Sequence, residues 1–217
     1  MYKAVVFDVD GTLIDGASVI KDMYRVYKEM TPDTTMVEKD FEICYFLSPD
    51  ETWEYLGIAQ NQEKIDYFRQ EVYGEINHRP FKGISEVVQK LKEMGLELGV
   101  NTSRGQLGWE RAKVQLGDEL AMLFDYVVTS DLVENNKPAP DSLFYLLEKM
   151  NLKKEEVLYI GDSIFDARCA HAAGCDFALA AWGFHQDVDY QEKYLLHQPE
   201  AVLGILTNAS DTTDKRK

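Results

Sequence analysis

Cysteine is scarce in this sequence, and long hydrophobic runs are missing. The 217 residues include three cysteines, Cys44, Cys169 and Cys175, and no two of them have CxxC spacing. An odd number of cysteines without paired spacing is not typical of a disulfide framework and favours the reducing cytoplasm. No run of about eighteen apolar residues occurs, so we expect no membrane-spanning helix. The first residues enter a strand pattern at once, so we also expect no signal peptide.

Basic residues are few relative to acidic ones. Lysine and arginine number 23 against 38 aspartates and glutamates, which gives a formal net charge of −15. A surface of this sign repels nucleic acid and anionic membranes, so we expect neither as a partner. It does not exclude a small anionic substrate, because a metal ion, a lysine or a helix N-terminus reverses the field locally. The histidines have neither the spacing of a metal site nor that of a catalytic triad: His78, His171, His185 and His197.

The hydrophobic periodicity divides the chain into two kinds of region. The stretch "AVVFDV" at residues 4–9 has the pattern of a buried strand, and about residues 17–78 have a helical period with no buried strand. From Gly83 onward, predicted helices and strands alternate, which indicates a mostly parallel sheet with helices on both faces. We therefore predict an α/β fold with a helical insert. The expected ranges are 1–15 and 80–207 for the α/β core, 16–79 for the insert and 208–217 for a disordered polar tail.

Two aspartates end the first strand, in the motif Asp8-Val9-Asp10-Gly11-Thr12. Two carboxylates this close repel each other unless a cation lies between them. Mg²⁺ is bound in proteins by a few carboxylate oxygens together with substrate phosphate and water. A carboxylate such as Asp8 is already a nucleophile at neutral pH, and Asp10 is placed to give and take a proton. The alternative is an ordinary Asp-Gly turn, but D-x-D-G-T arises by chance in about 0.3% of chains of this length.

Three further polar clusters follow predicted strands. Ligands in open α/β sheets bind beyond the carboxyl ends of the strands, where all of these clusters fall. Each also has a simpler interpretation: a helix N-cap for the first, an exposed loop lysine for the second and a cap for the third. The clusters are Asn101-Thr102-Ser103-Arg104, Lys137 between Asn136 and Pro138, and Asp162 with Asp166 in "GDSIFD".

The spacing within the last two clusters is informative. Asp162 and Asp166 are four residues apart, which puts both carboxylates on one helix face. Asp162 is then a candidate metal ligand, and Asp166 a second ligand or a residue that orients the first. Pro138 and Pro140 restrict the backbone around Lys137, so the loop that presents this lysine is stiff. A lysine held in this way can neutralise carboxylates and a phosphate.

These four motifs, in this order, resemble the haloacid dehalogenase (HAD) superfamily of phosphohydrolases. The resemblance extends over the whole chain, and the insert is similar to the helical C1 cap of that superfamily, placed on a Rossmann-like core. The phosphoglycolate phosphatase-like subgroup is similar in "DGTLID", in "KPAPDSLF" and in Trp182-Gly183 after the last predicted strand of the sheet. Two positions depart from the common pattern: residue 16 is glycine where serine is frequent, and Arg104 stands where lysine is frequent.

The resemblance implies a role for each motif residue. Asp8 would form an aspartyl-phosphate, and Asp10 would be the general acid and base. Thr102, the Ser103 amide, Arg104 and Lys137 would bind the substrate, and Thr102 and Lys137 would also belong to the catalytic set. Asp10 would contribute its backbone carbonyl to the metal, and Asp166 would support the site. The implied metal set for Mg²⁺ is Asp8, Asp10, Asp162 and Asp166.

The implied function is a Mg²⁺-dependent phosphatase of the cytoplasm, a monomer or homodimer, that acts on a small phosphorylated metabolite. Phosphoglycolate, a sugar phosphate, a nucleotide and pyrophosphate all fit the motifs. Arg25, Arg69 and Arg79 are candidates to bind a second anionic group of the substrate. A phosphotransferase of the β-phosphoglucomutase type and a non-catalytic binding protein with the same fold are the alternatives. Dehalogenation does not fit, because dehalogenases of this superfamily replace the second aspartate, here Asp10, and need no metal.

Overall fold

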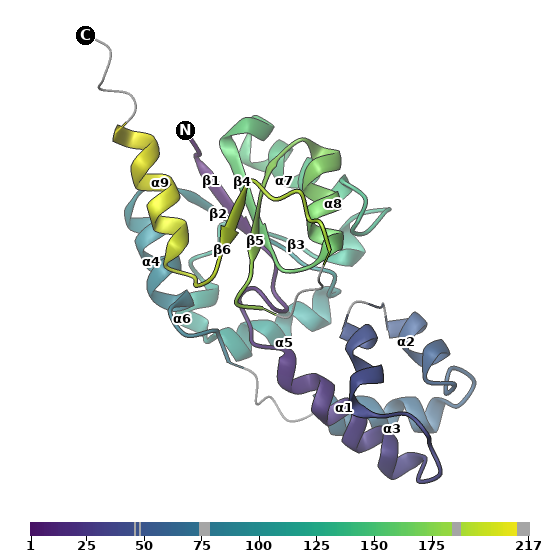
Figure 1. Cartoon of the computed structure of the whole chain (residues 1–217). Helices are drawn as coiled ribbons and strands as arrows, with labels where there is room; N and C mark the ends of the chain where they lie inside the picture. The colour runs from purple at the N-terminus through teal and green to yellow at the C-terminus, as the bar shows by residue number, and fades with distance from the viewer. Residues whose placement is uncertain (46, 48, 74–78, 184–187, 212–217) are drawn as a thin grey trace. The chain divides into compact units, whose positions relative to one another are not determined.

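The computed structural model describes residues 1–45, 47, 49–73, 79–183 and 188–211. Within the chain, two compact units are formed: residues 1–15 with 79–217, and residues 16–78. The first unit is the α/β part and the second is helical, so the predicted α/β fold with a helical insert is confirmed (Figure 1). No helix in the described ranges combines the length and apolar character that a membrane span requires.

A six-stranded parallel sheet forms the centre of the α/β unit, in the order β3-β2-β1-β4-β5-β6. The strands β1 and β4 are buried along their whole length, as expected for central strands that are covered on both faces. The strand bounds are β1 Ala4–Phe7, β2 Glu97–Asn101, β3 Tyr126–Val128, β4 Val157–Gly161, β5 Asp176–Ala180 and β6 Tyr194–Leu196.

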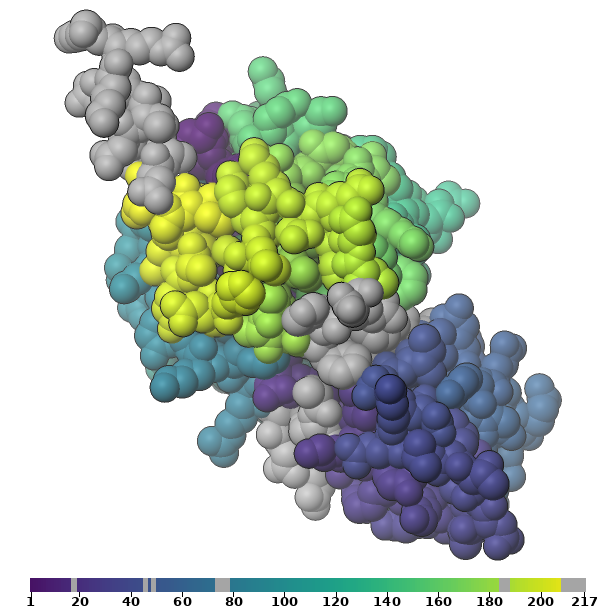
Figure 2. Space-filling model, in the orientation of Figure 1, coloured from purple at the N-terminus to yellow at the C-terminus, as the bar shows by residue number. Residues whose placement is uncertain are grey.

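Helices cover both faces of this sheet (Figure 1). One face packs against α4 (Ile84–Glu93), α5 (Gln106–Leu116), α6 (Asp118–Ala121) and α9 (Ala201–Asp211). The opposite face packs against α7 (Asp141–Met150) and α8 (Ile164–Ala173). Although α4 and α9 are far apart in sequence, they pack together at one side of the sheet (Figures 1 and 2). Short 3₁₀ turns at Ser130–Leu132 and Lys154–Glu156 complete the unit.

Side chains of the central strands alternate between the two cores. Val5 and Phe7 of β1 lie in the core under α4, whereas Ala4 and Val6 lie in the core under α7 and α8. Because successive side chains of a strand point to opposite faces of the sheet, an apolar strand has side chains buried on both faces. The register pairs Phe7 with Val100 of β2 and with Ile160 of β4, so the residues that follow these strands meet at one edge of the sheet.

The helical unit has a core of its own. Its elements are α1 Ala17–Met30, a 3₁₀ helix Glu38–Tyr45, α2 Pro49–Tyr55 and α3 Gln62–Tyr73. The ring of Phe41 packs against those of Tyr24 and Tyr27, and the rings of Trp53 and Phe68 meet edge to face. Aromatic residues therefore supply much of the packing of this small unit.

The C-terminal boundary and one strand differ from the sequence-based expectation. Helix α9 extends to Asp211, so residues 208–211, which were expected in a disordered tail, are helical; no glycine or proline follows Gly204 in this helix to end it earlier. Residues 212–217 lie outside the described part of the chain. The strand β6 was not predicted, because three residues between polar segments are too short for a periodic signal.

We predict that Leu143→Ala lowers the free energy of unfolding of the α/β unit by about 2–5 kcal/mol, because it leaves a cavity under α7. Leu143 is fully buried, whereas the next residue, Phe144, is 51% exposed. Phe144→Ala is the matched control and should cost less than about 1 kcal/mol. Urea unfolding of both variants measures the difference, and equal losses would contradict the assigned orientation of α7.

Candidate active site

The four polar clusters of the sequence meet at the carboxyl edge of the sheet. Asp8 follows β1, Thr102 follows β2 and Asp162 follows β4, three strands that are neighbours in the sheet. Lys137 reaches the same place from the loop that precedes α7. All of these residues belong to the α/β unit, so the site's core is formed without the helical unit.

Lys137 is the centre of the cluster. Its Nζ atom donates to Oδ1 of Asp8 at 2.6 Å and to Oδ1 of Asp166 at 2.7 Å, and it also lies 3.2 Å from the carbonyl oxygen of Asn101. Only 5% of its side chain is exposed, so the simpler interpretation as an exposed loop lysine is wrong. Burial by itself would lower the pKa of Lys137, but the neighbouring charges of Asp166 and Asp8 raise the pKa above its ordinary value.

The Asp166 carboxylate is held by hydrogen bonds on both oxygens. Oδ1 accepts from Lys137 and from the Tyr159 hydroxyl at 2.6 Å, and Oδ2 accepts from the backbone N–H of Ser163 at 3.1 Å and from its hydroxyl at 2.5 Å. These four bonds use the acceptor capacity of a carboxylate. The Ser163 hydroxyl also caps α8 through the Asp166 amide. The capping interpretation is therefore correct for Ser163, and Asp166 additionally orients Lys137.

Three buried carboxylates share this edge of the sheet. Oxygen atoms of Asp8, Asp162 and Asp166 all lie within 4.8 Å of one another. Burial raises the pKa of Asp8 to about 7, although the Lys137 charge opposes the shift. Burial, followed by the charges of Asp8 and Asp166, raises the pKa of Asp162 well above its ordinary value. One lysine does not balance three carboxylates, and buried oxygen donors of this kind suit a hard divalent cation such as Mg²⁺.

The side chain of Asp10 has a different partner. Its carboxylate accepts from Nε of Arg104 at 2.7 Å and from Nη2 at 2.5 Å, a bidentate ion pair. The Asp10 side chain is 39% exposed, in contrast to the buried carboxyls of Asp8 and Asp162. The structure therefore places the Asp10 carboxyl beside Arg104, outside the group of three carboxylates.

Thr102, Ser103 and Arg104 lie between β2 and α5. Thr102 is buried, and its hydroxyl accepts from the Arg104 amide at 3.1 Å; Ser103 is exposed. Helix α5 begins after Gly105 and has no side-chain cap, so the interpretation of Thr102 or Ser103 as its N-cap is wrong. The amide of Gln106, in the first turn of α5, donates instead to Asp131 at 3.0 Å.

A close backbone approach fixes the turn after Asp8. Gly11 has a φ of 80°, which favours glycine. The indole N–H of Trp182 donates to the Thr12 carbonyl at 3.0 Å, and the next residue, Gly183, lies directly against Gly11. A Cβ at position 183 would lie 2.0 Å from the Gly11 oxygen and 3.0 Å from Cβ of Asp162. Trp182-Gly183 therefore packs on the turn that carries Asp10.

Sequence reasoning missed Tyr159. Its hydroxyl, at the sheet face under α8, donates to Asp166 and lies 3.3 Å from Nζ of Lys137. The available signal was a tyrosine in the aliphatic strand "VLYIG", because a buried tyrosine hydroxyl requires a hydrogen-bond partner. Burial, together with the charge of Asp166, raises the pKa of Tyr159 well above its ordinary value, so this hydroxyl is a proton donor in the network.

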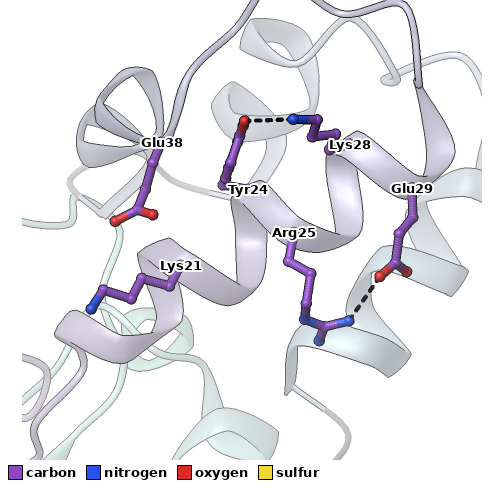
Figure 3. Close-up of a pocket in the computed structure, with 6 residues that line it drawn as sticks. All are labelled: Lys21, Tyr24, Arg25, Lys28, Glu29 and Glu38. Atoms are coloured by element: carbon purple, nitrogen blue, oxygen red, sulfur yellow. Dashed lines mark hydrogen bonds and ion pairs between the residues drawn. The ribbon is translucent and has the colours of Figure 1, made fainter.

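The helical unit has a hollow of about 430 Å³ on α1 (Figure 3). Its lining is mostly charged: Lys21, Tyr24, Arg25, Lys28, Glu29 and Glu38. Arg25 donates to Glu29 at 3.2 Å and lies 3.4 Å from Asp22. Of the other two candidate arginines, Arg69 lies over the Trp53 ring, and Arg79 accepts a backbone hydrogen bond from Asp15 in the α/β unit. These contacts do not assign a role in substrate binding to Arg25, Arg69 or Arg79.

The histidines do not join the cluster within the described residues. His171 lies in α8 with its ring near Phe177, and His197 follows β6. His78 and His185 lie outside the described residues.

Comparison with known proteins supplies an independent line of evidence. The sequence profile of the haloacid dehalogenase-like hydrolases matches residues 5–180. Pyrophosphatase PpaX of Bacillus cereus (strain G9842) is 29% identical over 222 aligned residues, which cover 95% of this chain and 97% of PpaX. The similarity thus extends over nearly the full length of both proteins.

Two solved structures are similar in fold. A haloacid dehalogenase-like family hydrolase from Streptococcus pneumoniae, SP0104, aligns with a TM-score of 0.79 at 22% identity, covering 94% of this chain and 98% of that one. A predicted phosphoglycolate phosphatase from Haemophilus somnus 129pt aligns with a TM-score of 0.73 at 21% identity, covering 94% and 98%. At these identities the likeness establishes the fold alone.

We predict that Gly183→Ala lowers the melting temperature by several degrees, because its methyl group would overlap the Gly11 carbonyl and displace the turn, at a cost of about 1–3 kcal/mol. Gly204→Ala is the matched control: no atom lies within 4 Å of the added Cβ, and alanine is favoured within α9. Calorimetry should therefore show an unchanged or higher melting temperature for Gly204→Ala. Equal behaviour of the two variants would show that the close approach at Gly183 does not constrain the turn.

Proposed function

Because the chain belongs to the family of haloacid dehalogenase-like hydrolases, as its motifs predict, we propose that it is a Mg²⁺-dependent phosphatase of small phosphomonoesters. The observation that carries the proposal is the contact between Lys137 and Asp8, 2.6 Å from Nζ to Oδ1, within a buried group of carboxylates. A lysine in this position holds the nucleophile in place and supplies positive charge where the phosphoryl group arrives. Phosphoryl transfer depends mostly on such positioning and charge neutralisation.

The reaction has two steps. A carboxylate oxygen of Asp8 attacks phosphorus, the bond from phosphorus to the ester oxygen breaks, and the departing oxygen takes a proton from Asp10 as the alcohol leaves. Water then attacks the phosphorus of the aspartyl-phosphate and gives a proton to Asp10. The bond between phosphorus and Asp8 breaks, which releases inorganic phosphate and restores both carboxyl groups.

Asp8 and Asp162 are the side chains that would hold Mg²⁺, and the backbone carbonyl of Asp10 would be the third protein ligand. The ion, when bound, supplies positive charge that offsets the carboxylates and the phosphoryl oxygens. The spacing of Asp166 allows two roles, a second metal ligand or a residue that orients the site. We propose the orienting role, because its oxygens already accept four hydrogen bonds. Thr102 and the Ser103 amide would hold phosphoryl oxygens beside Lys137.

The substrate class that we propose is a small phosphorylated metabolite of the cytoplasm. The relatives named above act, by their names, on pyrophosphate and phosphoglycolate, two small anions. A net charge of −15 is compatible with such a substrate, because Lys137 together with a bound divalent cation would offset the carboxylates where the phosphate binds. The cysteines Cys44, Cys169 and Cys175 are buried free thiols, which suits a reducing compartment.

We predict that Asp8→Asn lowers turnover by about 10³-fold or more, because an amide is a poor nucleophile. Asp10→Asn should lower turnover by about 10²–10⁴-fold and leave phosphate binding within about twofold. The measurement is phosphate release in a screen of phosphorylated metabolites that includes phosphoglycolate, pyrophosphate, sugar phosphates and nucleotides. Wild-type rates in Asp8→Asn would overturn the mechanism, and turnover that requires a sugar bisphosphate would favour the phosphotransferase alternative.

We predict that Mg²⁺ at about 100 times its dissociation constant stabilises the protein by about 2.7 kcal/mol, because the ion binds the folded state. Asp162→Asn should abolish this Mg²⁺-dependent rise in melting temperature. Glu119→Gln, which removes an exposed carboxylate on α6, should retain it. EDTA should stop phosphate release and added Mg²⁺ should restore it, whereas a metal-independent rate would contradict the metal-binding role of Asp8 and Asp162.

A further inference from the structure

Arg104 forms a bidentate ion pair with Asp10, whereas Lys137 contacts each of its carboxylates through the single atom Nζ. Nε and Nη2 of Arg104 each donate to a different carboxylate oxygen of Asp10, at 2.7 and 2.5 Å. Two parallel charge-assisted bonds fix both the distance and the plane of a carboxylate, which a single lysine contact cannot do. The orientation of the Asp10 side chain is therefore set from residue 104.

The guanidinium is itself held by α5. Nη1 of Arg104 donates to the Gly108 carbonyl at 3.2 Å and to Oε1 of Gln115 at 3.1 Å. The aliphatic part of the side chain lies over Gly108, where an added Cβ would be 2.9 Å from Cβ of Arg104 and 3.4 Å from Cγ. Gly108 therefore leaves the space that Arg104 occupies. Contacts along its whole length make Arg104 a fixed element.

The backbone on both sides of the pair is also fixed. The Arg104 amide donates to the Thr102 hydroxyl, and its carbonyl accepts from Ser130 at 3.0 Å. On the other side, Gly11 donates to the Ile14 carbonyl at 2.9 Å, which closes the turn that carries Asp10. Two rigid backbones joined by one bidentate pair leave the Asp10 carboxyl little freedom to rotate.

This arrangement competes with the role that the motif suggests for Arg104. Four N–H groups of the guanidinium point to protein acceptors: two oxygens of Asp10, the Gly108 carbonyl and Gln115. A guanidinium has five N–H donors in a fixed plane. Bidentate binding of a phosphoryl group by Arg104 would thus require the loss of a contact to Asp10 or α5.

We propose that Arg104 is a positioning residue that orients the Asp10 carboxyl for proton transfer, and that it does not bind the phosphoryl group. The proposal rests on the proposed function, since it concerns the proton transfers to the leaving oxygen and from water. Gly108 and Gln115 contribute to the same positioning, because they contact Arg104, which in turn orients Asp10.

The test compares Arg104→Gln with wild type, with phosphoglycolate or another alkyl phosphate hydrolysed in the metabolite screen as substrate, because its departing alkoxide requires a proton, and with inorganic phosphate as inhibitor. The expected result is a kcat about 10–100-fold lower, with KM and the phosphate inhibition constant within about twofold. Arg104→Lys should not restore kcat, because a point charge cannot orient a carboxylate bidentately. Arg111→Gln, an exposed arginine of the same helix, is the matched control and should behave as wild type.

A double-mutant cycle separates the two roles. If Arg104 acts only through Asp10, Arg104→Gln should change kcat by less than about twofold in an Asp10→Asn background. Gln115→Ala should lower kcat less than Arg104→Gln does, again with KM unchanged, and it serves if Arg104→Gln folds poorly. Additive losses in kcat, or a tenfold rise in KM and in the phosphate inhibition constant, would overturn the proposal and make Arg104 a phosphoryl ligand. A wild-type protein that hydrolyses no phosphomonoester would overturn the proposed function first.

Discussion

The buried ammonium of Lys137 is the interaction on which the rest of the site depends. It contacts the carboxylate of Asp8, which follows β1, and the carboxylate of Asp166, which lies in α8. It also contacts the carbonyl of Asn101 at the end of β2. Removal of a buried charge from such a group leaves its partners uncompensated, which is far more destabilising than the loss of a surface pair. A single side chain thus links three neighbouring elements of the sheet edge.

The site also has an excess of negative charge that the protein alone does not neutralise. Asp8, Asp162 and Asp166 are all buried, and the raised pKa values of the first two reflect their burial first and the neighbouring carboxylates second. Three buried carboxylates around one lysine are an unfavourable arrangement for stability and a favourable one for binding a cation and a phosphate. Folding of the α/β unit therefore tolerates an electrostatic cost at this edge of the sheet.

Much of the fold and of the candidate site could be predicted from the sequence, because the patterns that indicate them are short and contiguous. Apolar runs of period two end in short polar motifs, so the α/β fold, the strand ends and residues Asp8, Lys137 and Asp162 follow from pattern and order alone. The pairing of Asp10 with Arg104, 94 positions apart, could not, because either residue has several possible partners until the strands are in register. Tyr159 and the close approach of Gly183 to Gly11 could not be predicted for the same reason: the partner of a hydroxyl and the need for a missing Cβ are known only once the chain is packed.

The chain leaves and re-enters the α/β unit at a single point. Asp15 donates to the Arg79 carbonyl at 3.0 Å, and Ile14 bridges Pro80 in antiparallel fashion, so the two connections to the inserted residues are joined to each other. Because the entropy cost of closing a loop grows only with the logarithm of its length, a long insertion between two ends that are joined in this way costs the α/β unit little. A different insertion at this junction would therefore leave unchanged the strand ends that carry the four polar clusters, all of which lie outside residues 16–78.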